Sequence, residues 1–188
     1  MITVICGCMF AGKSGELLRM LKRHRIAKRS VQVFKPSLDT RDVGEQQTAV
    51  VRTREGGSLS AVGVSSVHQI PDLLNPDTQV IAIDEIQFFD GDLRDALALA
   101  SLAQKWASEG RYVVLSGLDM DYQGLPFDTT AMACTVAHRV IKLTAICEVC
   151  GDEAQHTLRV GDDTERLSPG HSYQPVCYRH ASLSAPQK

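Results

Sequence analysis

The chain lacks any long hydrophobic run, because no apolar stretch approaches the roughly 20 residues that a membrane-spanning helix needs. It also has little net charge, a formal −2 in 188 residues, so no overall field favours nucleic acid or an anionic membrane. It contains no internal repeat and no low-complexity segment. A core-strand pattern begins at Ile2, which leaves no room for a signal peptide. We therefore expect a cytoplasmic protein with no membrane or nucleic-acid partner.

What is present is the alternating pattern of an α/β domain. Short apolar runs predict buried parallel strands at residues 2–6, 31–34, 80–83, 112–115 and 139–143. Segments 14–29 and 92–109 carry Leu or Ala along one face, as amphipathic helices do. The alternation predicts a parallel sheet flanked by helices, with ligands at the carboxyl ends of the strands. The polar, glycine-rich residues 39–63 predict a long loop or mobile hairpin near that ligand site.

A glycine loop follows the first predicted strand. Its sequence is Gly7-Cys8-Met9-Phe10-Ala11-Gly12-Lys13-Ser14, which reads G-x-x-x-x-G-K-S, and a predicted helix follows it. In such a loop, backbone N–H groups and the helix dipole bind phosphate oxygens. Lys13 would reach the β- and γ-phosphates of a nucleotide, and the Ser14 hydroxyl would bind Mg²⁺. The alternative is an ordinary glycine-containing βα turn. Cys8 could react beside Lys13, but we favour a packing role for it.

A second pattern is the apolar run 80–83 followed by Asp84-Glu85. A strand that ends in a carboxylate can deliver that acid to Mg²⁺ at the sheet edge. Asp84 would hold the metal, and Glu85 would accept the proton of an attacking hydroxyl in a kinase or orient water in an ATPase. A solvated acid at a strand end is the plainer alternative for Glu85.

The third pattern is a pair of short cysteine motifs, Cys147-x₂-Cys150 and Cys177-x₂-His180. Together they supply four ligands of the kind that hold a tetrahedral, structural Zn²⁺. The alternatives are a disulfide or unpaired buried thiols. From Thr144 onward, cysteines, turn residues and short strands replace the α/β pattern. We therefore predict a nucleotide-binding α/β domain at 1–143, a small zinc-binding domain at 144–181 and a disordered tail at 182–188.

Segment 14–29 is also rich in Lys and Arg, which could attract nucleic acid. It has no interleaved aromatic residues on which bases could stack. We favour a solvated or subunit-facing surface. From the residues alone, the rival function is an ATPase whose zinc module and basic helix hold single-stranded nucleic acid.

The motifs in this order resemble the zinc-containing (type II) thymidine kinases. The resemblance rests on the phosphate loop, Asp39-Thr40-Arg41, the run Ile83-Asp84-Glu85-Ile86-Gln87-Phe88-Phe89, Leu118-Asp119, Pro126-Phe127, Lys142-Leu143-Thr144-Ala145 and the four zinc ligands. It covers nearly the whole chain. It implies transfer of the γ-phosphate of ATP to the 5′-hydroxyl of thymidine or deoxyuridine. It also implies a homotetramer that is inhibited by the triphosphate end product, dTTP.

The resemblance implies roles for individual residues. Glu85 matches the catalytic base, and Lys13 and Ser14 match ligands of the phosphates and Mg²⁺. Asp39, Arg41, Asp84 and Gln87 join the residues of the phosphate loop as expected contacts of Mg-ATP. The expected thymidine contacts are Met9, Phe88, Leu118, Tyr122, Phe127, Thr157 and Tyr173, the last two on a zinc-tethered loop called the lasso. The chain departs from the family at Gly15, where Thr or Glu is usual, and at 168–171 in the lasso.

Overall fold

The protein is described by a computed structural model that places residues 1–37, 48–52, 57–89, 91–161, 166 and 172–181. Its centre is a seven-stranded sheet with the order β3-β4-β2-β5-β6-β1-β7, parallel except where β3 pairs antiparallel with β4. The strands are β1 (Ile2–Gly7), β2 (Val31–Pro36), β3 (Thr48–Arg52), β4 (Ser58–Val64), β5 (Val80–Ile83), β6 (Tyr112–Gly117) and β7 (Arg139–Leu143). All five predicted strands are present, which confirms the predicted α/β fold.

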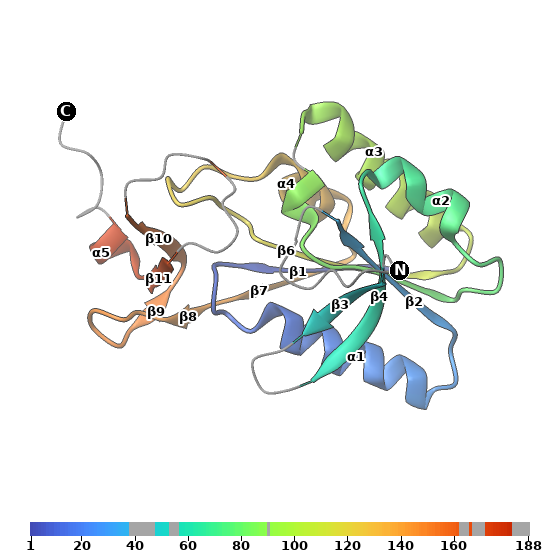
Figure 1. Cartoon of the computed structure of the whole chain (residues 1–188), viewed down its shortest axis with the longest axis horizontal. Helices are drawn as coiled ribbons and strands as arrows, with labels where there is room; N and C mark the ends of the chain where they lie inside the picture. The colour runs from blue at the N-terminus through green and yellow to red at the C-terminus, as the bar shows by residue number, and fades with distance from the viewer. Residues whose placement is uncertain (38–47, 53–56, 90, 162–165, 167–171, 182–188) are drawn as a thin grey trace.

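Helices cover both faces of this sheet (Figure 1). They are α1 (Lys13–Ile26), α2 (Ile70–Leu73), α3 (Leu93–Ser108) and α4 (Asp128–Val136), with the 3₁₀ turns η2 (Val67–Gln69) and η3 (Ile86–Phe89). Leu17 and Leu21 of α1 pack on one face, with Val33 and Ala82 from the sheet. The single tryptophan, Trp106, is buried on the opposite face with the other α3 residues, as a core role predicts. Alternate residues of the central strands therefore serve two separate hydrophobic layers.

The two long helices, α1 and α3, have boundaries close to those predicted, and nearby residues explain where α3 begins and where α1 ends. Asp92 caps α3, because its side chain accepts hydrogen bonds from the backbone N–H groups of Arg94 and Asp95. Helix α1 stops at Ile26 rather than at 29, and Lys28 adopts a left-handed φ of 57°. A left-handed residue ends the helical hydrogen-bond pattern, so the basic segment turns back toward β2.

The segment predicted as a long loop or mobile hairpin contains regular structure. Its described part forms the β3–β4 hairpin, and β4 continues the main sheet by pairing with β2. Buried Leu59 and Ala61 alternate with exposed Ser58 and Ser60 along β4, which is the period of a half-buried strand. Residues 38–47 lie outside the described part of the chain.

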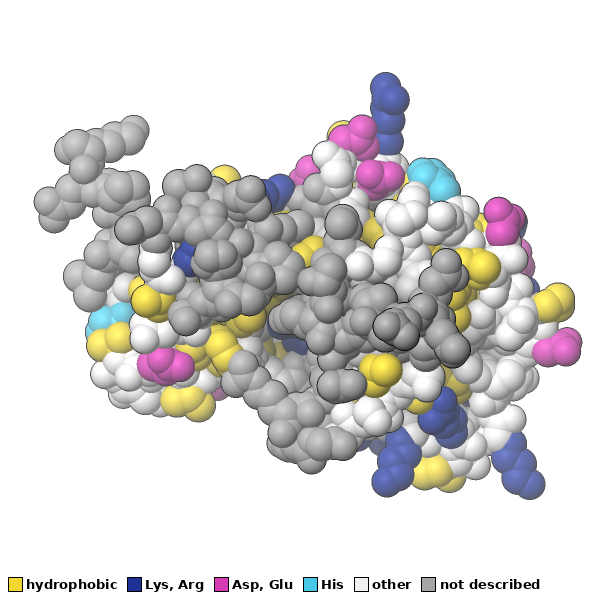
Figure 2. All heavy atoms as spheres, in the orientation of Figure 1, with side chains coloured by type: hydrophobic (Ala, Val, Ile, Leu, Met, Phe, Trp, Pro, Cys, Tyr) yellow, Lys and Arg dark blue, Asp and Glu magenta, His cyan; other side chains and the backbone are white. Residues whose placement is uncertain are grey.

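The basic surface lies on α1. The exposed cations are Arg19, Lys22, Arg23, Arg25 and Lys28. In Figure 2 Lys and Arg side chains project at the lower right, where α1 ends in Figure 1. The neighbouring aromatic ring, Tyr112, is covered by the guanidinium of Arg29 at 4.3 Å and by the ring of His24 at 4.9 Å. Among the described residues, no helix combines the length and apolar content needed to cross a membrane.

A second, smaller unit follows β7, which ends one residue before the predicted boundary at Thr144. It contains two antiparallel strand pairs and a short helix: β8 (Ala145–Ile146) with β9 (Glu153–Ala154), β10 (His156–Val160) with β11 (Ser172–Val176), and α5 (Tyr178–Ala181). Its small core of Ala145, Ala154 and Val176 also contains Cys8 of the glycine loop. We call residues 144–181 the zinc module. Its core therefore packs directly against the predicted phosphate site (Figure 1).

Candidate functional site

The glycine loop lies at the carboxyl end of β1 and has an unusual backbone. Gly7 has a φ of 136°, and a Cβ there would lie 2.1 Å from the carbonyl oxygen of Leu143, so only glycine fits. Phe10 and Gly12 also have positive φ values, of 66° and 83°. A side-chain-bearing residue such as Phe10 adopts this region at a cost, and such strain concentrates at functional sites. The backbone of residues 7–12 therefore has the tightly curled form that phosphate binding requires.

The lysine of this loop lies over it. Helix α1 begins at Lys13, and the Lys13 ammonium donates a hydrogen bond to the carbonyl oxygen of Cys8 over 2.7 Å. Ser14 is in the first turn of the same helix, where backbone N–H groups are free to bind an anion. The Cys8 thiol is buried and donates to the carbonyl oxygen of Ala154, and burial raises its pKa. Cys8 is thus a packing residue, as we favoured, rather than a reactive thiolate.

Asp84 follows directly after β5 at the same edge of the sheet. Its side chain is buried, and its backbone N–H bonds to the carbonyl oxygen of Phe34 on the neighbouring strand. Burial, and next the charge of Glu85, raise the pKa of Asp84 to about 6, against the opposing effects of the Ser116 hydroxyl and Lys35. A buried carboxylate that is costly to ionise is suited to a site where a cation binds.

Glu85 is held in a strained and oriented position. Its φ of 55° is left-handed, which turns the chain sharply after β5. Gln87 donates a hydrogen bond to the Glu85 carboxylate over 2.5 Å, and its amide oxygen accepts the backbone N–H of Leu118 over 3.0 Å. Gly117 makes this possible, because a Cβ there would lie 2.8 Å from the Gln87 amide oxygen. Gln87, which we predicted as a nucleotide contact, thus joins Glu85 to a predicted nucleoside contact.

Lys35 is a buried cation that none of the motifs includes. It follows Phe34, which pairs with Ile83 of β5, so Lys35 is opposite Asp84 in the sheet register. Phe34 and Ile83 both belong to the α3 layer. Strands alternate their side chains, so Lys35 and Asp84 both lie on the α1 face, which is the face of the glycine loop. Its only signal in the sequence is a single lysine near the end of a mostly apolar strand.

The loop between β6 and α4 carries three of the predicted nucleoside contacts: Leu118, Tyr122 and Phe127. The backbone of Leu118 is held on both sides, because Gln87 accepts its N–H and the Thr130 hydroxyl donates to its carbonyl oxygen over 2.7 Å. Phe127 is buried, and Tyr122 is half-buried. Phe88 lies on η3, half-buried, and its backbone N–H bonds to the carbonyl oxygen of Glu85. The predicted catalytic base, Glu85, and these predicted nucleoside contacts therefore lie on segments that are joined by hydrogen bonds.

The zinc module reaches both the glycine loop and this second loop. The Thr157 hydroxyl accepts the backbone N–H of Met9 over 2.9 Å. The Tyr173 hydroxyl accepts a hydrogen bond from Arg159 over 3.0 Å, and the Arg159 guanidinium covers the ring of Tyr122 at 4.1 Å. Met9, Tyr122, Thr157 and Tyr173 were predicted from distant parts of the chain, and the fold brings them into connected contacts. Arg159 is a further residue of this site that the motifs did not include.

The cysteine motifs come together as predicted. The ligand atoms of Cys147, Cys150, Cys177 and His180 all lie within 4.8 Å of one another. The two sulfurs of Cys150 and Cys177 are 3.8 Å apart, about the edge of a tetrahedron with Zn–S bonds of roughly 2.3 Å. Burial alone would raise the pKa of Cys147, but hydrogen bonds from backbone groups and from His180 lower it to about 6. A thiolate is the form that binds zinc, so this donor set fits a closed Zn²⁺ site.

Two predicted contacts, Asp39 and Arg41, lie outside the described residues, as does the lasso segment 168–171. The other predicted site residues are all described. Their roles toward ATP, Mg²⁺ and a nucleoside remain predictions, which the arrangement of the site supports.

Comparison with known proteins identifies the relatives of this chain. A family model described as thymidine kinase matches residues 1–181. A protein named thymidine kinase from Rhodothermus sp. (strain ITI 518) is 41% identical over 180 residues, which are 95% of this chain and 79% of that protein. Both findings agree with the resemblance drawn from the motifs.

Two solved structures show a more distant likeness. One is domain III of the replication initiation protein DnaA from Thermotoga maritima, 14% identical, with a TM-score of 0.42 over 76% of this chain and 54% of that one. The other is a DNA replication initiation factor, 9% identical, with a TM-score of 0.43 over 76% of this chain and 39% of that one. The matched region thus spans little more than half of the first and less than half of the second.

Proposed function

The chain belongs to the thymidine kinase family, and we propose that it transfers the γ-phosphate of ATP to the 5′-hydroxyl of thymidine. The observation that best supports this proposal is the Glu85–Gln87–Leu118 connection, which fixes a carboxylate beside the loop of predicted nucleoside contacts. A hydrolase needs only a water near such a carboxylate. A kinase needs a pocket for the acceptor nucleoside whose position is fixed relative to the catalytic carboxylate. We propose deoxyuridine as a second acceptor.

We assign the roles of the residues from the family resemblance, and the geometry of the described residues supports them. The loop 7–12, Lys13 and Ser14 bind the phosphates of ATP, with Arg41 and Asp39 as further contacts by family resemblance. Asp84 and Ser14 would hold Mg²⁺, which neutralises charge on the phosphates when it is bound. Glu85, oriented by Gln87, accepts the proton of the 5′-hydroxyl as that oxygen attacks the γ-phosphate. The buried Lys35 offsets part of the negative charge of Asp84 from the neighbouring strand.

The zinc module has a structural role in this proposal. Four protein ligands leave no open position on a tetrahedral zinc, so the ion would not take part in the chemistry. It would instead fix the ends of the segment that carries Thr157 and Tyr173. Both side chains contact the predicted active site, through Met9 and through Arg159 and Tyr122.

The same family membership supports proposals about the setting of the enzyme. We propose a cytoplasmic homotetramer that is inhibited by dTTP and has no nucleic-acid or membrane partner. The rival function, an ATPase that holds single-stranded nucleic acid, has no specific observation in its favour. The ring of Tyr112, which contacts the basic helix through His24, is covered by Arg29 and His24 and offers little surface to a base.

The experiment that separates the two functions uses the zinc-loaded protein under reducing conditions. Incubation with Mg-ATP and thymidine, followed by chromatography, should show thymidine monophosphate formed in proportion to ADP. Absence of the monophosphate, with ATP hydrolysis that increases on addition of single-stranded DNA, would refute the proposed function in favour of its rival.

A further inference from the structure

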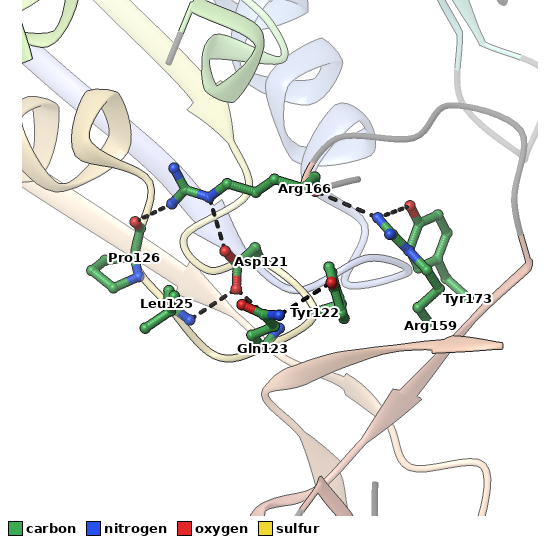
Figure 3. A network of polar contacts seen from close by, with 8 residues as sticks. All are labelled: Asp121, Tyr122, Gln123, Leu125, Pro126, Arg159, Arg166 and Tyr173. Atoms are coloured by element: carbon green, nitrogen blue, oxygen red, sulfur yellow. Dashed lines mark hydrogen bonds and ion pairs between the residues drawn. The ribbon is translucent and has the colours of Figure 1, made fainter. Parts of the chain in front are cut away.

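Arg166 connects the zinc module to the loop between β6 and α4 through three contacts, of which Figure 3 shows the two polar ones. Its Nε donates to the Asp121 carboxylate over 2.8 Å, and its Nη2 donates to the carbonyl oxygen of Pro126 over 2.6 Å. The centre of its guanidinium lies 4.6 Å from the ring centroid of Phe127. One side chain thus contacts an acid, a backbone carbonyl and an aromatic ring in the same loop. The planar fork of arginine can make such a combination, whereas the single ammonium of lysine cannot.

The partner of this arginine is itself firmly held. The side chain of Asp121 is 2% exposed, and its Oδ1 accepts the backbone N–H groups of Gln123 and Leu125, each over 2.9 Å. Its Oδ2 is the atom that contacts Arg166. Asp121 therefore uses one oxygen to shape the loop and the other to bind the zinc module. A charge-assisted bond to a buried, fixed carboxylate is stronger than one to a mobile surface acid.

A second arginine makes a parallel contact from β10. Arg159 covers the ring of Tyr122 at 4.1 Å and donates to the Tyr173 hydroxyl over 3.0 Å. The zinc module therefore places one guanidinium on Tyr122 and another on Phe127, the two aromatic residues of this loop that we predicted as thymidine contacts. Figure 3 shows the hydrogen bonds of both arginines, and Arg159 also donates to the backbone carbonyl oxygen of Arg166 over 3.5 Å. These contacts hold the orientation of each ring.

We propose that Arg166 is a positioning residue for the nucleoside. It acts through Asp121 and Phe127 to hold the base pocket in its binding form, and it does not touch the phosphates. This inference rests on the proposed function, because it concerns how the same site binds thymidine. It differs from the lasso contacts expected by resemblance, which are Thr157 and Tyr173. Loss of Arg166 should weaken thymidine binding and leave ATP binding and the chemical step nearly unchanged.

The test is a set of four variants measured with each substrate varied in turn. Arg166→Met removes the charge and keeps an aliphatic side chain of similar length. Arg166→Lys keeps the charge but loses the planar guanidinium group. Asp121→Asn removes the charge of the partner, and the fourth variant combines Asp121→Asn with Arg166→Met. The matched control is Arg19→Met, because Arg19 also pairs with a carboxylate, that of Glu16 at 2.6 Å, but on the exposed surface of α1.

We expect Arg166→Met to raise the KM for thymidine roughly 10-fold, the effect of one charge-assisted hydrogen bond, with a smaller rise in Arg166→Lys. The KM for ATP and kcat should stay within about threefold of wild type, because neither depends on the base pocket. The double variant should be little worse than the poorer single variant, since the two side chains act as one unit. Calorimetric binding of thymidine without ATP should show the same pattern in Kd.

Three outcomes would overturn the inference. These are an unchanged thymidine KM in Arg166→Met, effects of the two single variants that simply add, or a fall in kcat and in both affinities together, which would indicate a general structural role. Thermal unfolding of each variant identifies misfolded protein, and Arg166→Lys gives a reading if Arg166→Met fails to fold. A wild-type protein that makes no thymidine monophosphate refutes the proposed function instead, before any variant is compared.

Discussion

The hydroxyl of Thr157 accepts the backbone N–H of Met9 over 2.9 Å, and so joins the zinc module to the phosphate loop. The two residues are far apart in the sequence and belong to different predicted domains. Because Met9 lies within the loop that would bind ATP, this bond, together with that from Cys8 to Ala154, couples the position of the phosphate loop to that of the module. Met9 therefore belongs to both the predicted nucleotide site and the predicted nucleoside site.

This bond can be removed with little change in shape. Thr157→Val replaces the hydroxyl by a methyl group and leaves the Met9 N–H without its partner. A side chain–backbone bond of this kind contributes about 0.5–1.5 kcal/mol, so we expect the KM values for thymidine and ATP both to rise roughly two- to tenfold. Steady-state kinetics with each substrate varied measures this. Thr157→Ser keeps the hydroxyl and should behave like wild type, and equal effects of Ser and Val would argue against a role for the bond.

Asp84 should make the ligand-free protein less stable as the pH rises. Its pKa is raised from 3.8 to about 6 in the folded protein, so between these values the folded state binds more protons than the unfolded state. The contribution of Asp84 to stability is therefore present below about pH 4 and is lost as the pH rises through about 6. Asp84→Asn, which imitates the protonated form, should gain on the order of 2 kcal/mol over wild type between pH 4 and pH 7.5.

Denaturant unfolding at several pH values measures that difference. The variant should at the same time lose turnover with Mg-ATP, because it lacks the metal carboxylate. Asp77→Asn, at an exposed position, is the control and should show no such pH-dependent gain. If the free energy of unfolding depended on pH in the same way in wild type and Asp84→Asn, the interpretation of Asp84 as a buried carboxylate with a raised pKa would be contradicted.

Two glycines of the phosphate loop and α1 should respond in opposite directions to the same substitution. A Cβ at Gly15 meets no atom within 4 Å, and Gly15 lies in the first turn of α1 with an ordinary φ. Gly15→Ala should therefore stabilise the protein by about 0.5–1 kcal/mol. Gly12 has equal space but a φ of 83°, so Gly12→Ala should destabilise it by about 1–2 kcal/mol. Denaturant unfolding followed by the fluorescence of Trp106 compares the two variants. Changes of the same sign in their free energies of unfolding would refute the role assigned to φ.

The sequence predicted best those parts of the fold that depend on local pattern. Strands β5 and β7 have the predicted bounds, because β5 is an uninterrupted run of Val, Ile and Ala, and the Val, Ile and Leu of β7 indicate a strand despite its two cations, Arg139 and Lys142. Helix α4 was not predicted, since Thr129, Thr130 and Cys134 are weak helix formers and its stability comes from packing against α3. Strand β4 was predicted only as part of a long loop or mobile hairpin, because its serines and glycine are typical of a loop, and its pairing with β2 in the main sheet was not predicted.

The same distinction applies to the site. Residues in spaced motifs, such as Lys13, Glu85 and Cys150, could be found because their chemistry requires that spacing. Lys35, Arg159 and Arg166 could not, because each is a single cation whose partner lies far away in the sequence. Their roles depend on the sheet register and on the packing of the zinc module, which no local pattern records.

The metal site predicts one tightly bound zinc per chain. Cys150→Ser should lose the zinc and lower the midpoint of thermal unfolding by roughly 5 °C or more, because the ion fixes two distant segments of the module. Elemental analysis of the purified protein and a thermal scan measure both effects. Cys134→Ser changes a half-buried cysteine outside the cluster and should keep its zinc. A wild-type chain without zinc, prepared with zinc in the medium, would contradict the assignment.

The measurement that tests the account most directly is the rate of γ-phosphate transfer from labelled ATP to thymidine in wild type and in Glu85→Gln. Glutamine keeps the size of the side chain but cannot accept the proton of the 5′-hydroxyl. We predict thymidine 5′-monophosphate from the wild-type enzyme and a kcat lower by on the order of 10²-fold or more in the variant, with ATP still bound. Equal rates of transfer in the two proteins would contradict the role of Glu85 as the base, on which the account depends.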